Sequence, residues 1–177
     1  MSTLAPPDLR SARAAFSGGR GYLAACTVGL PPRATRAAVI ADLDAAAAGR
    51  ATAADYSAVV ERTRGHFARL VGADVSRIAI GSQASVFAGL LAAAVPDGAE
   101  VLCAEGDFSS IVLPFVHAGR GVRVRTAPLD RLADAITADT WLVAFSLVQS
   151  ASGEVADAVA IRTAAARHGA RTVCDAT

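Results

Sequence analysis

The chain has 177 residues, of which 53% are hydrophobic and 19% are charged, and its formal net charge is +1. This composition is typical of a folded domain and excludes a disordered chain, because disorder combines few apolar residues with a large net charge. The nearly neutral charge gives no reason to expect a nucleic acid or an anionic membrane as a partner.

All 17 basic residues are arginine, so the chain contains no lysine. The lysine amine forms Schiff bases with carbonyl compounds, whereas the arginine guanidinium stays protonated and does not. The sequence therefore excludes a lysine-based covalent step within these 177 residues.

The three cysteines are far apart in the sequence and form neither a CxxC pair nor the spacing of a zinc site; they are Cys26, Cys103 and Cys174. Cys103 and Cys174 lie in apolar runs, where we expect small buried side chains. The sequence shows no disulfide framework, and its first residues lack the apolar core of a signal peptide. We therefore expect a cytoplasmic protein without a metal site.

The first half of the chain predicts helices. Residues 1–21 are rich in Pro, Gly and Arg and are expected to form an N-terminal arm with one short helix at residues 8–16. The apolar run Tyr22–Val28 ends in a Gly-Leu-Pro-Pro turn. Apolar side chains at helical spacing then predict helices over residues 34–48 and 56–71.

From residue 73 onward the pattern alternates between strands and helices. Strands are predicted at residues 77–80, 100–104, 122–126, 140–146 and 171–174, and helices at 82–94, 109–118, 129–136 and 155–168. Alternation of this kind predicts a three-layer α/β/α domain with a largely parallel sheet. The chain stops just after the last strand, where ligand-binding loops usually begin, so residues 22–177 are expected to be an incomplete domain truncated at its C-terminal end.

A possible anion site follows the first predicted strand, at Gly81-Ser82-Gln83-Ala84-Ser85. The N–H groups at the start of a helix attract anions, and the two serine hydroxyls would add donors. The alternative is that Ser82 or Ser85 only caps the helix.

Polar and aromatic side chains also follow three later strands. Phe108 is placed to stack on a flat ligand or to pack beneath the next helix. Gln149 and Ser150 are placed to bind a ring substituent or to satisfy their own loop. Asp175 is placed to pair with a protonated ring nitrogen or to cap a helix. Together, the set suits a planar, phosphorylated, N-protonated heterocycle.

Five stretches, in order, resemble the class V aminotransferase fold, the group that contains cysteine desulfurases, kynureninase and isopenicillin N epimerase-like proteins. They are YLAACTVGLPP, IAIGSQAS, EGDFSSIVLPF, VAFSLVQSASGEVAD and RTVCDAT. The resemblance implies the N-terminal part of the large domain of a fold-type I transferase that depends on pyridoxal 5′-phosphate. It also implies an amino acid as substrate and a homodimer in the full-length form.

The resemblance assigns a role to each candidate residue. Ser82 and Gln83 would cradle the cofactor phosphate, and Phe108 would stack on its ring. Gln149 and Ser150 would lie near the 3-hydroxyl, and Asp175 would pair with the pyridine nitrogen. Thr27 and Val28 would border the substrate.

The departures from the family pattern limit the expected activity. The Schiff-base lysine of the family lies downstream of the Asp175 strand, and no catalytic residue is assigned here. Phe108 stands where desulfurase-like members have histidine, which argues against a desulfurase and leaves transaminase, lyase and epimerase chemistry open. The alternative to an enzyme is a non-catalytic remnant, or a dimerisation or binding module of the same fold.

Overall fold

The computed structural model describes residues 8–25 and 27–177, and Cys26 lies outside the described residues. The chain divides into two compact units, Met1–Ile80 and Gly81–Thr177. The predicted division into an arm of residues 1–21 and a domain of residues 22–177 stays a prediction. No helix in the described part is long and apolar enough to cross a membrane.

The first unit is helical, as the apolar spacing predicts. It contains α1 (Leu9–Ala14), α2 (Arg33–Ala47), α3 (Ala53–Val71) and the short 3₁₀ helix η1 (Val75–Arg77). Thr52 caps α3 by accepting a hydrogen bond from the Asp55 N–H at 3.3 Å, and Gly72 ends it in the left-handed conformation. The three predicted helices of this region are therefore confirmed, with shifts of up to three residues at their ends.

Most apolar side chains of the first unit are exposed. No residue of α2 is buried, and Ala68 is the one buried residue of α3. Phe67 is 50% exposed and Leu70 is 81% exposed. Both helices thus present apolar stripes without a covering layer among the described residues.

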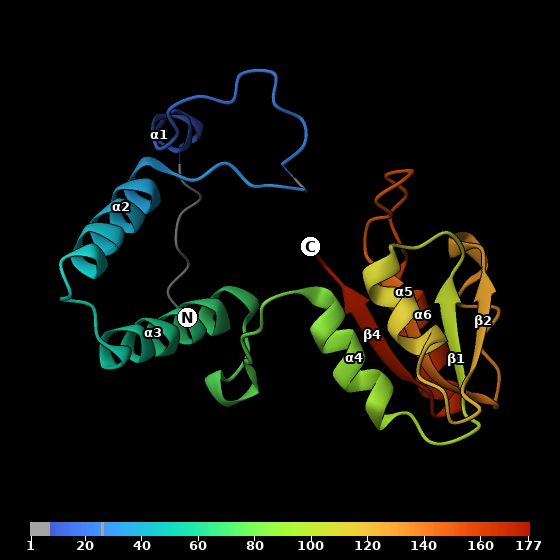
Figure 1. The fold of residues 1–177 in the computed structure, drawn as a ribbon. Coiled ribbons are helices and arrows are strands. Elements are labelled where there is room, and N and C mark those ends of the chain that lie inside the picture. The colour runs from blue at the N-terminus through green and yellow to red at the C-terminus, as the bar shows by residue number, and fades with distance from the viewer. Residues whose placement is uncertain (1–7, 26) are drawn as a thin grey trace. The chain divides into compact units, whose positions relative to one another are not determined.

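The second unit contains a four-stranded parallel sheet among the described residues, in the order β2-β1-β3-β4 (Figure 1). The strands are β1 (Glu100–Ala104), β2 (Arg123–Ala127), β3 (Thr140–Ser146) and β4 (Arg171–Asp175), and the helices are α4 (Ala84–Ala94), α5 (Ser109–Val116) and α6 (Ala158–His168). This arrangement confirms the α/β class and the parallel sheet.

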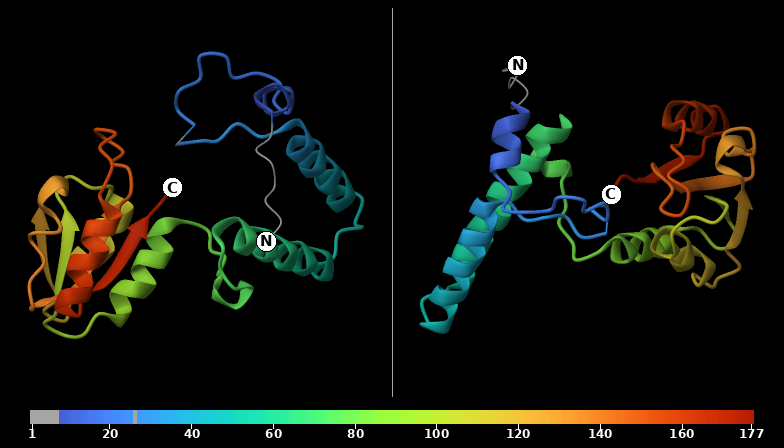
Figure 2. Two further views of the ribbon diagram at one scale, coloured as in Figure 1. Left: turned by 180° about the vertical axis from the view of Figure 1, so that it is seen from behind. Right: turned by 90° about the horizontal axis from the view of Figure 1, so that it is seen from above.

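The sheet is covered on both faces, as successive side chains of a strand point to opposite sides. Leu102 and Val143 face α6, together with the segment after β2, whereas Val101 and Leu142 face α4 and α5. Figures 1 and 2 show α6 on one side of the sheet and the other two helices on the opposite side. The predicted three layers are therefore confirmed.

Two predicted elements are wrong. Residues 77–80 do not form a strand: Arg77 ends η1, and the residues after it have no paired strand in the part of the chain that is described. A strand needs such a partner to be stable. The predicted helix at 129–136 is a 3₁₀ helix, η2 (Leu129–Arg131), followed by turns. The residues at the end of the predicted helix bond to other elements: the Ala135 carbonyl accepts from Arg125, and the Thr137 N–H donates to the Thr140 hydroxyl.

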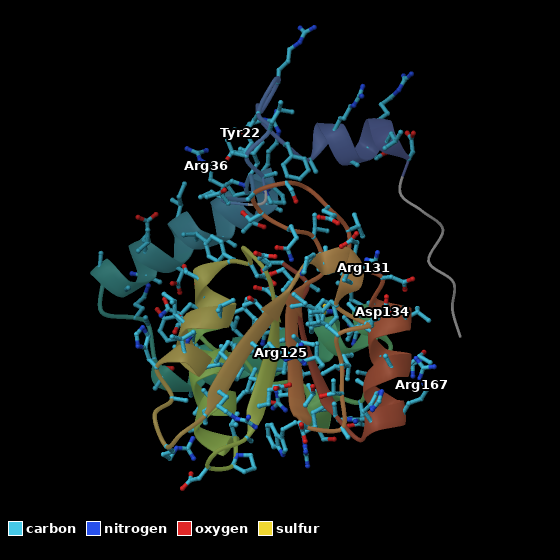
Figure 3. All side chains as sticks on the ribbon, turned by 90° about the vertical axis from the view of Figure 1, so that its right-hand side faces the viewer. Tyr22, Arg36, Arg125, Arg131, Asp134 and Arg167 are labelled. Atoms are coloured by element: carbon cyan, nitrogen blue, oxygen red, sulfur yellow. The ribbon has the colours of Figure 1, made fainter. Side chains whose placement is uncertain are left out.

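A polar cluster ties the amino ends of three strands together. Arg125 of β2, which lies among the strands in Figure 3, forms an ion pair with Glu100 of β1 at 3.0 Å. The Thr140 hydroxyl of β3 donates to the same carboxylate at 2.9 Å. The hydrogen bond from Arg125 lowers the pKa of Glu100, and the Thr140 hydroxyl adds to this against the effect of burial.

Candidate functional site

The candidate site lies at the carboxyl edge of the sheet. Because the strands are parallel, β1, β3 and β4 end at the same edge (Figure 1). The chain leaves β1 toward β2 and then returns to β3 on the other side of β1. The boundary between β1 and β3 is therefore a topological switch point, where α/β sheets of this type hold their ligands.

The start of α4 also belongs to this edge. The residues after α4 meet the start of β2, where the Gly98 N–H donates to the Arg120 carbonyl at 3.0 Å. The guanidinium of Arg120 donates to the Ala92 and Val95 carbonyls at 2.8 and 2.9 Å and so caps the end of α4. Because α4 ends at the amino edge and crosses the sheet, it begins near the carboxyl edge.

The first turn of α4 offers free donors. Gln83 precedes the helix and makes no side-chain capping bond, and both Ser82 and Gln83 are exposed. A Cβ atom at Gly81 would lie 2.5 Å from Cζ of Phe87, so the Phe87 ring would have to shift if the glycine were replaced. Ser82 was predicted either to bind an anion or to cap the helix. The structure shows no capping bond from a side chain at the start of α4, and anion binding by Ser82 stays a prediction.

A shallow hollow adjoins this turn. It is lined by the first turns of α4 and α5 together with the following turn of α5; the residues are Ser85, Ser109, Ser110, Leu113, Pro114 and His117. The hollow places the hydroxyl groups of Ser109 and Ser110 beside Ser85 of the predicted anion site.

The segment after β1 carries Phe108 and an acidic residue that the sequence analysis missed. Gly106 turns the chain at φ 70°, and Phe108 then precedes α5 with 52% of its surface exposed. Between them, Asp107 accepts hydrogen bonds from the Phe108 N–H at 2.7 Å and from the Ser146 N–H at 2.8 Å. The Phe108 ring is accessible to a ligand, and its stacking role stays a prediction. The signal for Asp107 was its place between the end of a strand and the start of a helix.

The segment after β3 is a small hairpin in which Val148 pairs with Val155. Gln149 is buried, and its amide nitrogen donates to the Ser146 carbonyl at 3.3 Å. Ser150 lies exposed at the turn. Gln149 thus satisfies its own loop, one of the two roles that the sequence left open, while the contact of Gln149 and Ser150 with a ring substituent stays a prediction.

Asp175 ends β4 beside this hairpin. Its carbonyl accepts from the Leu147 N–H at 2.7 Å, and its Oδ1 accepts from the Thr177 N–H at 3.1 Å and the Thr177 hydroxyl at 2.6 Å. The described residues give its other carboxylate oxygen, Oδ2, no hydrogen bond. One oxygen of Asp175 is therefore held in place while the other remains available.

The two described cysteines, Cys103 and Cys174, have raised pKa values, first because of burial and then because of nearby carboxylates. Cys103 is buried as predicted, and burial, followed by the charge of Asp107, raises its pKa to about 12. Cys174 was predicted to be buried, which is wrong: it is exposed because β4 is an edge strand. Partial burial and then the charges of Asp175 and Asp107 raise the pKa of its thiol. Both carboxylates therefore act on the same edge.

The two predicted substrate contacts belong to the other unit. Thr27 and Val28 lie on an exposed loop, where Tyr22 donates its hydroxyl to the Val28 carbonyl at 2.8 Å. Their place beside a substrate stays a prediction.

Comparison with known proteins gives one family and a consistent fold. The family model described as aminotransferase class-V matches residues 33–177. The cysteine desulfurase CsdA of Escherichia coli has a TM-score of 0.75 and 21% identity, over 94% of this chain and 48% of that one. A variant of C-DES with glycine covalently linked to its pyridoxal phosphate cofactor has a TM-score of 0.74 and 18% identity, over 97% and 50%. The apo cysteine desulfurase of Thermococcus onnurineus NA1 has a TM-score of 0.60 and 22% identity, over 66% and 32%.

The chain thus spans 32% to 50% of the length of these solved structures. At these identities the likeness shows the fold, a fold-type I domain present in part. No match was found among curated proteins.

Proposed function

The chain belongs to the class-V aminotransferase family, and we propose that it forms the cofactor-binding part of a pyridoxal-phosphate enzyme that acts on an amino acid. The observation that carries the proposal is the carboxyl edge of the second unit. That edge gathers an uncapped helix start, an exposed aromatic ring and a carboxylate with one free oxygen. The C-DES relative, which carries pyridoxal phosphate linked to glycine, has the same fold.

The start of α4 suits the phosphate group. Its first N–H groups have no capping side chain, and Ser82 and Ser85 add hydroxyl donors there. Gly81 lets the Phe87 ring close over the turn, a position that a Cβ atom would fill. Charge-assisted hydrogen bonds from backbone N–H groups to an anion are among the stronger kind in proteins.

Phe108 and Asp175 suit the ring. The half-exposed Phe108 ring would stack on a planar heterocycle, and Asp175 would hold a proton on the ring nitrogen. A bound, N-protonated cofactor supplies a ring that accepts electron density from the Cα of an amino acid. This chemistry is common to transaminases, lyases and epimerases.

The 177 residues bind this cofactor without a covalent link, because none of them is lysine. The role of these residues is to hold the phosphate, orient the ring and fix the proton on its nitrogen.

Pyridoxamine 5′-phosphate tests the proposal directly, because it has no aldehyde and reports noncovalent binding alone. We would titrate it into the folded chain by calorimetry and compare it with pyridoxamine, which lacks the phosphate. The phosphorylated probe should bind more tightly by about tenfold or more, because charged hydrogen bonds at the start of α4 are lost with the phosphate.

The matched variants are Asp175→Asn at the carboxyl edge and Asp139→Asn in the exposed loop before β3. We expect the first to weaken binding of the phosphorylated probe and the second to leave it unchanged. A folded chain that gives no saturable binding would contradict the proposal.

A second candidate, which the exposed apolar stripes of α2 and α3 favour, is a dimerisation module of the same fold. The stripes include Ile40, Leu43, Phe67 and Leu70. Large exposed apolar patches mark contact surfaces. Sedimentation equilibrium should then show a homodimer that Leu43→Arg dissociates, whereas a monomer at all concentrations would exclude this role.

A further inference from the structure

Asp107 joins the two loops that carry the predicted ring contacts. One carboxylate oxygen accepts the Phe108 N–H at 2.7 Å, and the other accepts the Ser146 N–H at 2.8 Å. Phe108 carries the exposed ring after β1, and Ser146 opens the hairpin after β3. A single side chain therefore fixes the start of both loops.

These two bonds span the topological switch point. β1 and β3 are neighbours in the sheet, but the 35 residues 105–139 separate the end of β1 at Ala104 from the start of β3 at Thr140. The register between β1 and β3 ends at Cys103 and Ala144, and the next contact across this boundary that involves Ser146 is its bond to a side chain. Asp107 provides this side-chain bridge at the position where sheets of this type bind ligands.

The same bridge reaches Asp175 through the backbone. The Ser146 N–H donates to Asp107, and the next residue, Leu147, donates its N–H to the Asp175 carbonyl at 2.7 Å. The order Phe108, Asp107, Ser146-Leu147, Asp175 is thus a continuous chain of hydrogen bonds and covalent links along the edge.

We propose that Asp107 is a positioning residue that sets the distance between the stacking ring of Phe108 and the carboxylate of Asp175. This role rests on the proposed function, because it concerns the same cofactor edge. A positioning residue of this kind does not touch the ligand; it acts by fixing backbone groups on both sides.

The test combines amide hydrogen exchange with ligand binding. In Asp107→Ala we expect the Phe108 and Ser146 amides to exchange about tenfold faster or more, because each loses a charged acceptor. The amides of Leu102 and Val143, inside the strands, should keep their protection. The Asp107→Ala chain should bind pyridoxamine 5′-phosphate about tenfold more weakly or worse.

The Asp107→Asn variant is a milder second probe, because its amide keeps one acceptor oxygen. It should lose protection at one of the two amides and weaken binding less than Asp107→Ala does. Asp139→Asn is the matched control, with both readouts unchanged.

The outcomes separate this inference from the proposed function. If the wild-type chain does not bind the probe, the proposed function fails and takes this inference with it. If the wild-type chain binds and Asp107→Ala binds equally well, only the positioning role is overturned. The positioning role would also be overturned if both Asp107 variants bound the probe more weakly and lost amide protection at Leu102 and Val143. That result would show that Asp107 only stabilises the fold.

Discussion

Removing the charge of Glu100 tests how the sheet is held at its amino edge. The Glu100 side chain is 12% exposed, and its Oε1 lies 3.0 Å from a guanidinium nitrogen of Arg125 and 2.9 Å from the Thr140 hydroxyl. The change Glu100→Gln keeps the shape of the side chain but leaves Arg125 without its counter-charge. The three strands β1, β2 and β3 then lose a common anchor.

The expected cost follows from the geometry. Breaking a fully buried pair costs about 3–5 kcal/mol, and a hydrogen bond to a charged group is worth about 1.5–3 kcal/mol. The Arg125 side chain is 38% exposed, so water screens part of the interaction and compensates the orphaned charge. We therefore expect Glu100→Gln to lower the free energy of unfolding by about 1–3 kcal/mol at pH 7.

Urea unfolding followed by circular dichroism measures this difference. The control is Glu105→Gln, an exposed carboxylate just after β1 that makes no side-chain bond with the described residues, for which we expect a change within about 0.5 kcal/mol. Because the folded pKa of Glu100 is lowered from 4.5, its stabilisation is complete above that value and is lost as the pH falls through the folded pKa. The gap between wild type and Glu100→Gln should therefore close in acid. Equal effects of the two variants at pH 7 would refute the reasoning.

Three further predictions concern the second unit. Gly81→Ala should weaken binding of pyridoxamine 5′-phosphate, because the new Cβ would meet the Phe87 ring before the start of α4. In Gly89→Ala, within α4, the new Cβ meets nothing within 4 Å, so this variant should stabilise the chain by about 0.5–1 kcal/mol in thermal unfolding. Asp175→Asn should lower the pKa of Cys174, which moves the pH dependence of its alkylation downward in peptide mass spectra; an unchanged profile would argue against that charge. Leu132→Ala, at a fully buried position, should cost about 2–5 kcal/mol in urea unfolding, and a loss below 1 kcal/mol would show that this core is loosely packed.

The sequence predicted the elements that are defined by their own residues. The β1 and β3 strands match their predicted bounds because both are apolar runs buried on two faces. The α4, α5 and α6 helices were found because each buries a stripe of apolar side chains against the sheet. The class of fold follows from this alternation, which is a local property of the chain.

The errors arise where distant residues decide the structure. Residues 77–80 have the composition of a strand but no partner, and the pairing of a strand is not encoded in its own residues. In residues 129–136, the buried Leu129, Leu132 and Ile136 repeat at helical spacing, yet the chain forms only the 3₁₀ helix η2 and turns. The residues that follow η2 bond to Arg125 and Thr140 in other elements.

The candidate site shows the same division. Phe108 and Asp175 could be placed at the sheet edge because each follows a predicted strand that is confirmed, whereas the strand predicted before α4 does not form. Asp107 was missed, since its second partner, Ser146, is 39 residues away and becomes a neighbour only when β1 and β3 pair. Cys174 appeared buried because its run is apolar, but the edge position of β4 leaves it exposed.

The protonation state of the bound ring nitrogen tests the central claim most directly. We would record the ¹⁵N shift of pyridoxamine 5′-phosphate labelled at the ring nitrogen, bound to the wild-type chain and to Asp175→Asn, above the pH at which the free ring loses its proton. Our account predicts a protonated nitrogen in the wild-type complex and an unprotonated one in the variant. An unprotonated nitrogen in both complexes would contradict the pairing of Asp175 with the cofactor.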